Sequence, residues 1–261
     1  MKKYIDLHAH PFKEYFENPH QIIEDSHKAG IDTMMLIGTC VEDSKEVKEL
    51  ASKHTYTFPV IGIHPNDASN NDDLPKLREL MDQSVVAIGE IGFDFHYDDS
   101  PSQEQQEIFF RYQVELALEF DVPVIIHSRD STEATFELLK EYKGKYPKMK
   151  IVIHSYSSGP DWVERFLNIG AYLSFSGVVT FKNAKDVQEA AKITPLDRIF
   201  YETDTPYLSP APMRGKTNIP SYAIHTAKFI ADLKEIGVEE LNVEVNKSVE
   251  LLFNLNKEKN E

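Results

Sequence analysis

Histidines and carboxylates recur in this sequence where short apolar runs end. Five of the ten histidines and two acidic residues hold such positions: His8, His10, His64, His127, His154, Glu90 and Asp204. Imidazole and carboxylate groups bind borderline divalent metal ions, and they also accept or donate protons in hydrolytic reactions. These residues therefore indicate a metal centre. The other five histidines fall in expected helices or loops: His20, His27, His54, His96 and His225.

The first apolar run ends in His8-Ala9-His10. Side chains alternate along a strand, so His8 and His10 point to the same side and can bind one ion. The pair alone is weak evidence, because a buried histidine is more often a hydrogen-bonded core residue. Its significance depends on partners from other strands.

A second group of ligands is expected from the neighbouring fifth and sixth strands, which end in His127 and His154. Glu90 has two carboxylate oxygens and stands on a strand between the two groups, so it is placed to bridge two ions. Asp204, on the last strand beside the first, would complete the shell of the first ion. Such a set suits Zn²⁺ or Mn²⁺ and accepts Mg²⁺ less tightly.

Two further acids precede expected ligands by two residues and are in phase with them. Asp6 stands in this relation to His8, and Glu202 to Asp204. Each could orient a ligand through a hydrogen bond. A packed or solvated carboxylate is the alternative for both.

The elements that must position these residues form a regular series. Eight strand-like runs are expected, at residues 3–10, 32–39, 57–65, 85–92, 122–128, 150–156, 171–177 and 198–204. Helical spacing of apolar residues follows most of them, at 42–54, 72–83, 102–120, 131–143, 160–170, 183–192, 221–236 and 238–254. The runs are almost continuously apolar, which is typical of parallel strands covered by helices on both faces. Eight β/α units in about 250 residues predict a (β/α)8 TIM-type barrel, with a doubly wound open sheet as the alternative.

Composition limits the kind of partner. The chain has 261 residues and a formal net charge of −15, so a broad electrostatic grip on nucleic acid is not expected. The N-terminus lacks the apolar segment of a signal peptide, and no apolar run approaches the ~18 residues of a membrane span, so we expect a cytoplasmic protein without a membrane or obligate protein partner. The single cysteine, Cys40, is interpreted as a packing residue rather than a nucleophile. Residues 1–255 are expected to form one domain, and 256–261 a disordered tail.

Several motifs occur in an order that resembles the TatD family of metal-dependent hydrolases, which are amidohydrolase-like barrels. They are "DLHAH", "GIHP", "GEIGFDF", "VIIHSRD", "VIHSYS", "YLSFSG", "FKNA", "ETDTPYLSP" and "RGKTNIP", and they span about 90% of the chain. Where many relatives have "HCHLD", "HCFSG" and "RGKxNEP", this chain has "HAHP", "HSYSS" and "RGKTNIP". No metal ligand is lost by these changes, but the contacts with substrate are expected to differ.

The resemblance implies a (β/α)8 barrel, two divalent metal ions and a deoxyribonuclease activity. It places the metal ligands at the six positions reached above, namely His8, His10, Glu90, His127, His154 and Asp204. It also implies that His64 contacts the scissile phosphate or the attacking water. We therefore expect a phosphodiesterase that acts on the ends of single-stranded DNA.

The expected reaction needs a proton acceptor and cations for the phosphate. Asp204 is the candidate to orient and deprotonate the water, with Glu90 and His64 beside it. Arg129, Arg214 and Lys216 are candidate phosphate contacts, although surface ion pairs would also explain the arginines. Five aromatic residues could stack bases near the mouth: Phe93, Phe95, Tyr97, Tyr156 and Tyr207.

Two other functions are compatible with the same residues. A metal-activated water attacks carbonyl carbon as well, so hydrolysis of an ester or amide on a small or acylated substrate is the second hypothesis. A metal-binding scaffold without catalysis is the third, and the complete set of ligands weighs against it.

Overall fold

Eight parallel strands form a nearly closed barrel in the computed structural model, which describes residues 4–255. The strands are β1 (Tyr4–Ala9), β2 (Ile31–Ile37), β3 (Thr57–Ile61), β4 (Ala87–Asp94), β5 (Val124–Arg129), β6 (Ile151–Ile153), β7 (Ala171–Phe175) and β8 (Ile199–Tyr201). Each strand pairs with the next along the chain, in the order β1 to β8. The predicted barrel is confirmed, and the open sheet is excluded.

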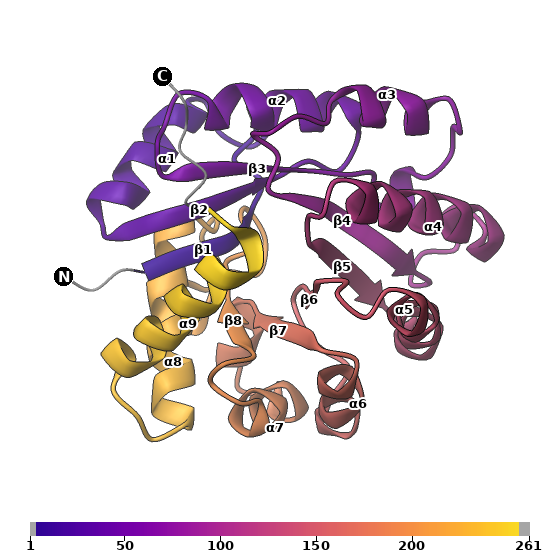
Figure 1. The fold of residues 1–261 in the computed structure, drawn as a ribbon. Coiled ribbons are helices and arrows are strands. Elements are labelled where there is room, and N and C mark those ends of the chain that lie inside the picture. The colour runs from indigo at the N-terminus through magenta and orange to yellow at the C-terminus, as the bar shows by residue number, and fades with distance from the viewer. Residues whose placement is uncertain (1–3, 256–261) are drawn as a thin grey trace.

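Helices surround the ring of strands, as Figure 1 shows. They are α1 (Pro19–Lys28), α2 (Val41–Ala51), α3 (Asp73–Glu79), α4 (Gln103–Glu119), α5 (Thr132–Lys145), α6 (Val163–Asn168), α7 (Lys185–Ile193), α8 (Ala223–Leu233) and α9 (Val238–Phe253). Short 3₁₀ helices lie at Pro65–Asp67, Pro160–Trp162, Gly177–Thr180, Ala211–Met213 and Pro220–Tyr222. Helix α1 is the one connection that the sequence pattern did not identify. It begins at a proline whose preceding residue, Asn18, accepts a hydrogen bond from Gln21 N–H.

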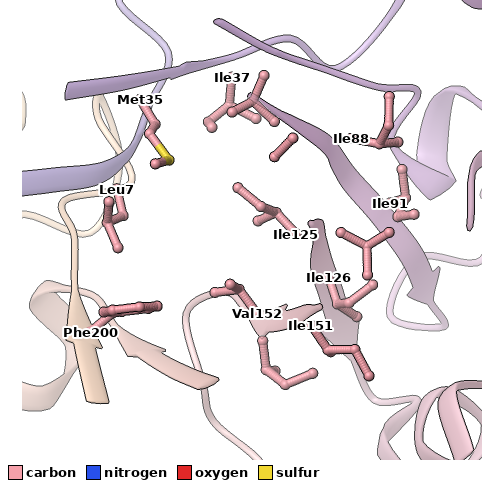
Figure 2. Packing of buried hydrophobic residues seen from close by; sticks show 14 of the residues in the cluster. Leu7, Met35, Ile37, Ile88, Ile91, Ile125, Ile126, Ile151, Val152 and Phe200 are labelled. Carbon is pink, nitrogen blue, oxygen red and sulfur yellow. The ribbon is translucent and has the colours of Figure 1, made fainter. Parts of the chain in front are cut away.

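Apolar side chains fill both sides of the sheet, as the continuous apolar runs predicted. Every residue of β1, β4, β6 and β8 is buried. Figure 2 shows part of this core, in which Met35 and Ile125 point into the space that the strands enclose. Ile125 precedes His127 by two residues and shares its side of the sheet, so the core supports the histidine from below.

Glycines let β4 approach β5 closely. A Cβ atom at Gly89 would lie 2.6 Å from the Cβ atom of Ile125, and one at Gly92 would lie 2.0 Å from the carbonyl oxygen of His127. Gly92 also has a φ of +145°, which favours glycine. The motif "GEIG" is thus explained by this close approach, which brings Glu90 next to His127.

The junction between β8 and β1 is held largely by a side chain. Ala9 and Thr205 form an isolated bridge there, and Asp204 N–H donates to the His8 carbonyl at 2.9 Å. Asp6 accepts from the N–H of Thr203 at 2.8 Å and from its hydroxyl at 2.6 Å. Because Asp6 is fully buried, burial raises its pKa to about 8. The Asp6 carboxyl group is therefore mostly protonated at neutral pH. It links β1 to the residues after β8, and its contact with His8 is to the backbone N–H rather than to the imidazole.

Cys40 lies at the start of α2, where its Sγ atom accepts a hydrogen bond from Asp43 N–H. Partial burial raises the pKa of this thiol to about 11, so it is protonated at neutral pH. Among residues 4–255, none of the helices has the length and hydropathy needed to cross a membrane. The expected tail at 256–261 lies outside the described residues.

Candidate metal centre

The six expected metal ligands converge at the carboxyl ends of the strands. His8 belongs to β1, Glu90 to β4 and His127 to β5, while two of the others directly follow β1 and β6 and the third lies three residues after the end of β8. They are His10, His154 and Asp204. Parallel strands bring these residues together because all their carboxyl ends lie on one face of the barrel.

One group of ligands surrounds the first oxygen of Glu90. The Nε2 atoms of His8 and His10 are 3.1 Å apart, and each lies 3.5 Å from Glu90 Oε1. Asp204 Oδ1 is 3.6 Å from His10 Nε2 and 3.9 Å from His8 Nε2. Four side chains thus direct one atom each toward a common point.

The second oxygen of Glu90 faces a different pair of histidines. Glu90 Oε2 lies 3.3 Å from His127 Nδ1 and 3.6 Å from His154 Nε2. Asp204 Oδ1 is also 3.8 Å from His154 Nε2. Glu90 therefore stands between the two groups, as the sequence predicted for a bridging carboxylate.

These distances fit metal ions. Two ligand atoms at about 2.1 Å from one ion lie about 3.0–3.5 Å apart at bond angles of 90–110° and about 3.9 Å apart at about 135°. Burial alone would raise the pKa of Glu90 and of Asp204, but the facing histidines lower both below the usual range. Both carboxylates are therefore ionised, which suits them to a divalent cation.

Two further carboxylates contact His154 and His127, each at the ring nitrogen that faces away from Glu90. Glu202 Oε1 lies 2.7 Å from His154 Nδ1, and Asp94 Oδ2 lies 2.9 Å from His127 Nε2. Glu202 also accepts from Ser155 N–H at 2.7 Å. Glu202 was expected to serve Asp204, but it instead orients His154. Asp94 was not identified from the sequence.

His64 follows β3 and lines the cavity that the candidate ligands His10, Glu90 and His127 also line. Burial and the neighbouring His127 lower its pKa to about 3, so the ring is neutral. Its Nδ1 atom accepts a hydrogen bond from Asn66 N–H at 3.1 Å. The proton of the neutral ring therefore resides on Nε2, which can donate a hydrogen bond.

Five of the six candidate ligands line a cavity of about 660 Å³, from which only the buried His8 is missing, and the rim of this cavity has two unlike sides. On one side, Arg129 donates to the hydroxyl of Tyr97 at 2.9 Å. On the other, the hydroxyl of Tyr207 donates to that of Tyr15 at 2.7 Å. Arg214 and Lys216 are exposed and are not among the residues that line the cavity. The Arg214 guanidinium instead lies over the ring of Phe181, 4.1 Å from its centre.

The expected aromatic residues at the mouth are only partly found there. Tyr97 and Tyr207 line the cavity, but Phe93 and Tyr156 are each 1% exposed and pack in the core. Phe95 does not line the cavity either. The prediction was wrong for Phe93 and Tyr156, because an aromatic residue near a strand end can pack into the core, whereas Phe95 is 36% exposed outside the cavity lining.

Sequence reasoning also missed Asn218, which is fully buried after β8. Its side-chain amide donates to the carbonyl groups of Thr203 and Tyr207, at 2.8 and 2.6 Å. These bonds fix the loop that carries Asp204. The only signal for this role was its place in the motif "RGKTNIP".

Comparisons with known proteins give consistent results. A family model described as TatD related DNase matches residues 5–254. YabD of Bacillus subtilis, an uncharacterized metal-dependent hydrolase, is 36% identical over 256 residues, which cover 97% of this chain and 99% of that protein. YcfH of Escherichia coli K12, another uncharacterized metal-dependent hydrolase, is 33% identical and covers 91% of this chain and 90% of its own length.

The fold has a similar match among solved structures. The crystal structure of YjjV, a TatD homologue from Escherichia coli K12, superposes with a TM-score of 0.89. That protein is 27% identical in sequence, and the match covers 96% of this chain and 98% of the other.

Proposed function

The chain belongs to the TatD family of metal-dependent hydrolases, and on this premise we propose that it is a phosphodiesterase acting on the ends of single-stranded DNA. The observation that carries the proposal is the position of Glu90. One of its oxygens faces His8, His10 and Asp204, and the other faces His127 and His154. These six side chains would hold two divalent ions, Zn²⁺, Mn²⁺ or Mg²⁺, with Glu90 shared by the two groups of ligands.

Two ions bound in this way would activate a water molecule as the nucleophile and neutralise charge on the phosphate. Asp204 carries an ionised carboxylate at the edge of the first group, so we assign it the role of orienting the water and taking its proton. A bond forms between the water oxygen and phosphorus while the bond to the leaving oxygen breaks. The products are a terminal phosphate and a free hydroxyl.

The phosphate needs donors from the protein as well. We assign His64 to one phosphate oxygen, because its neutral ring holds a proton on Nε2. Arg129 supplies a cation at the cavity rim. Arg214 and Lys216 follow the rim residue Tyr207 along the loop after β8, and we propose that they meet phosphates further along the strand.

The acidic composition favours the end of a single DNA strand, rather than a duplex, as the substrate. With a net charge of −15, the surface offers no broad attraction for a long polyanion. Two divalent ions and a few local cations can hold one or two phosphates of a strand end. We therefore expect weak binding that falls further as salt is added.

The test combines metal analysis with digestion of end-labelled single-stranded DNA. We expect His127→Ala to lose about one equivalent of metal and its cleavage together. His225→Ala, on helix α8, is the matched control and should keep both. Retention of metal and cleavage by His127→Ala would overturn the two-ion assignment. Turnover of p-nitrophenyl acetate without turnover of bis(p-nitrophenyl) phosphate would instead favour an ester hydrolase.

A further inference from the structure

A row of aromatic rings leads away from the metal centre along one side of the cavity. The ring of Phe12 lies 5.8 Å from that of His10, and the ring of Tyr15 lies 6.3 Å from Phe12. Tyr207 follows at 5.8 Å from Tyr15, with the two rings nearly perpendicular at 72°. We name Phe12, Tyr15 and Tyr207 the aromatic wall. All three line the cavity.

The aromatic wall is held in a fixed position relative to the expected metal ligands. Tyr207 N–H donates to the carbonyl of Asp204 at 2.7 Å, and Asn218 holds the Tyr207 carbonyl. Tyr15 N–H donates to the carbonyl of Phe12 at 3.0 Å. Phe12 is only 3% exposed, whereas Tyr15 and Tyr207 are 37% and 49% exposed. The buried ring of Phe12 thus lies next to that of Tyr15, which in turn lies next to that of Tyr207.

The opposite side of the cavity has a different character. Arg129 lies there against the ring of Tyr97, and the polar side chains of Asn66, Ser128 and Ser157 line it together with the acids Asp67 and Asp94. This side therefore offers one cation among polar groups. The aromatic wall offers flat apolar surfaces and carries no charge. A ligand that spans the cavity must therefore combine an anionic part with a flat apolar part.

We propose that the aromatic wall is the subsite for the nucleobase of the nucleotide whose phosphate lies at the metal centre. This inference rests on the proposed function and assigns its base contact. A base that stacks on one of the two tyrosine rings meets the edge of the other, since aromatic groups favour both arrangements. Every base has a flat face, so the contact accepts all four bases.

The test compares two ligands that share a phosphate and differ only in the base. Deoxyadenosine 5′-monophosphate carries the base, and 2-deoxyribose 5-phosphate lacks it. Their dissociation constants are measured by equilibrium dialysis against the Mn²⁺-loaded protein. We expect the wild type to bind the nucleotide about tenfold more tightly than the sugar phosphate, as one stacked base provides.

Three variants assign this preference to the wall. Tyr15→Ala should reduce the tenfold ratio to near one, while Tyr15→Phe, which keeps the ring, should retain most of it. Tyr146→Ala is the control, because Tyr146 is similarly exposed but lies between α5 and β6 at the other end of the barrel. Equal binding of both ligands by the wild type would overturn the inference. So would an unchanged ratio in Tyr15→Ala.

The outcome is separable from that of the proposed function. Failure of the wild type to cut end-labelled DNA would contradict the phosphodiesterase assignment but leave the binding ratio measurable. Conversely, a protein that cuts DNA and binds the two ligands equally would have its base contact elsewhere.

Discussion

The Oε1 atom of Glu202 lies 2.7 Å from Nδ1 of His154, and both side chains are buried at 1% and 5% exposure. Burial alone would raise the pKa of Glu202, but the charge of His154 lowers it below its usual value. The hydroxyl of Ser174 donates to its other oxygen at 2.5 Å. The ring of His154 is thereby oriented with Nε2 toward Glu90.

Replacement of Glu202 should weaken metal binding without removing a ligand. In Glu202→Gln, the ring of His154 loses its charged partner, and we expect the metal affinity to fall about 10- to 100-fold. Competition with a chromogenic chelator measures the change. Glu119→Gln, which breaks a surface ion pair with Arg78, is the control. Unchanged affinity in Glu202→Gln would show that packing alone orients the ring.

Asp94 should act in the same way on His127, the other histidine of the same pair. It contacts His127 Nε2 at 2.9 Å, so Asp94→Asn should weaken the site formed by His127 and His154. We expect one of two metal equivalents to be lost on dialysis, with the other retained. Loss of both equivalents, or of neither, would contradict the assignment of Asp94 to one half of the centre.

The junction of β1 and β8 should depend on the hydroxyl of Thr203. Thr203→Val keeps the shape of the side chain but removes one donor to the buried Asp6 carboxyl group. We expect the free energy of unfolding to fall by about 1–3 kcal/mol. Denaturant titration in the presence of a chelator measures this separately from metal binding. The exposed Asp99→Asn should change stability by less than about 0.5 kcal/mol.

Lys234 should make stability rise with pH in the alkaline range. It donates to the carbonyl of Lys192 at 2.9 Å, and burial lowers its pKa to about 8. Between pH 8 and about 10.4 the unfolded chain therefore binds more protons than the folded one, so deprotonation favours the fold. The difference in unfolding free energy between wild type and Lys234→Met should increase in favour of wild type over this range. A difference that does not vary with pH would refute this.

Lys228→Met supplies the control for that measurement. Lys228 is an exposed lysine on α8, the helix that Lys234 directly follows. Its replacement removes a positive charge from the same region of the surface. Subtracting its pH profile leaves the part that belongs to Lys234.

The sequence predicted the fold from its regular apolar runs, and it predicted the candidate ligands from the polar side chains at the ends of those runs. Eight apolar runs predicted the barrel, and the strand ends predicted which side chains would meet. Asp94 could have been found in this way, because it is four residues from Glu90 along the same strand. Alternation along β4 places both on one side of the sheet.

Loops gave no such pattern. Tyr15 precedes α1, and its partner Tyr207 is 192 residues away, so no spacing relates them. The place of Arg214 over Phe181 likewise depends on the path of a long connection. Glu202 was matched with Asp204 by alternation, but β8 ends at Tyr201 and the backbone then turns. The alternation of side chains holds only within a strand, so it does not predict the contacts of residues beyond the end of β8.

The junction between β8 and β1 also determines at which stage of synthesis the protein can become active. His8 and His10 leave the ribosome nearly 200 residues before Thr203 and Asp204. Asp6 has a local donor in the His8 N–H, but both of its donors on Thr203 arrive only with that last strand. Contacts between such distant parts of a chain form slowly. A nascent chain with seven strands would thus hold most of the ligands but an unsealed barrel, and catalytic competence would arise in the final stage of folding.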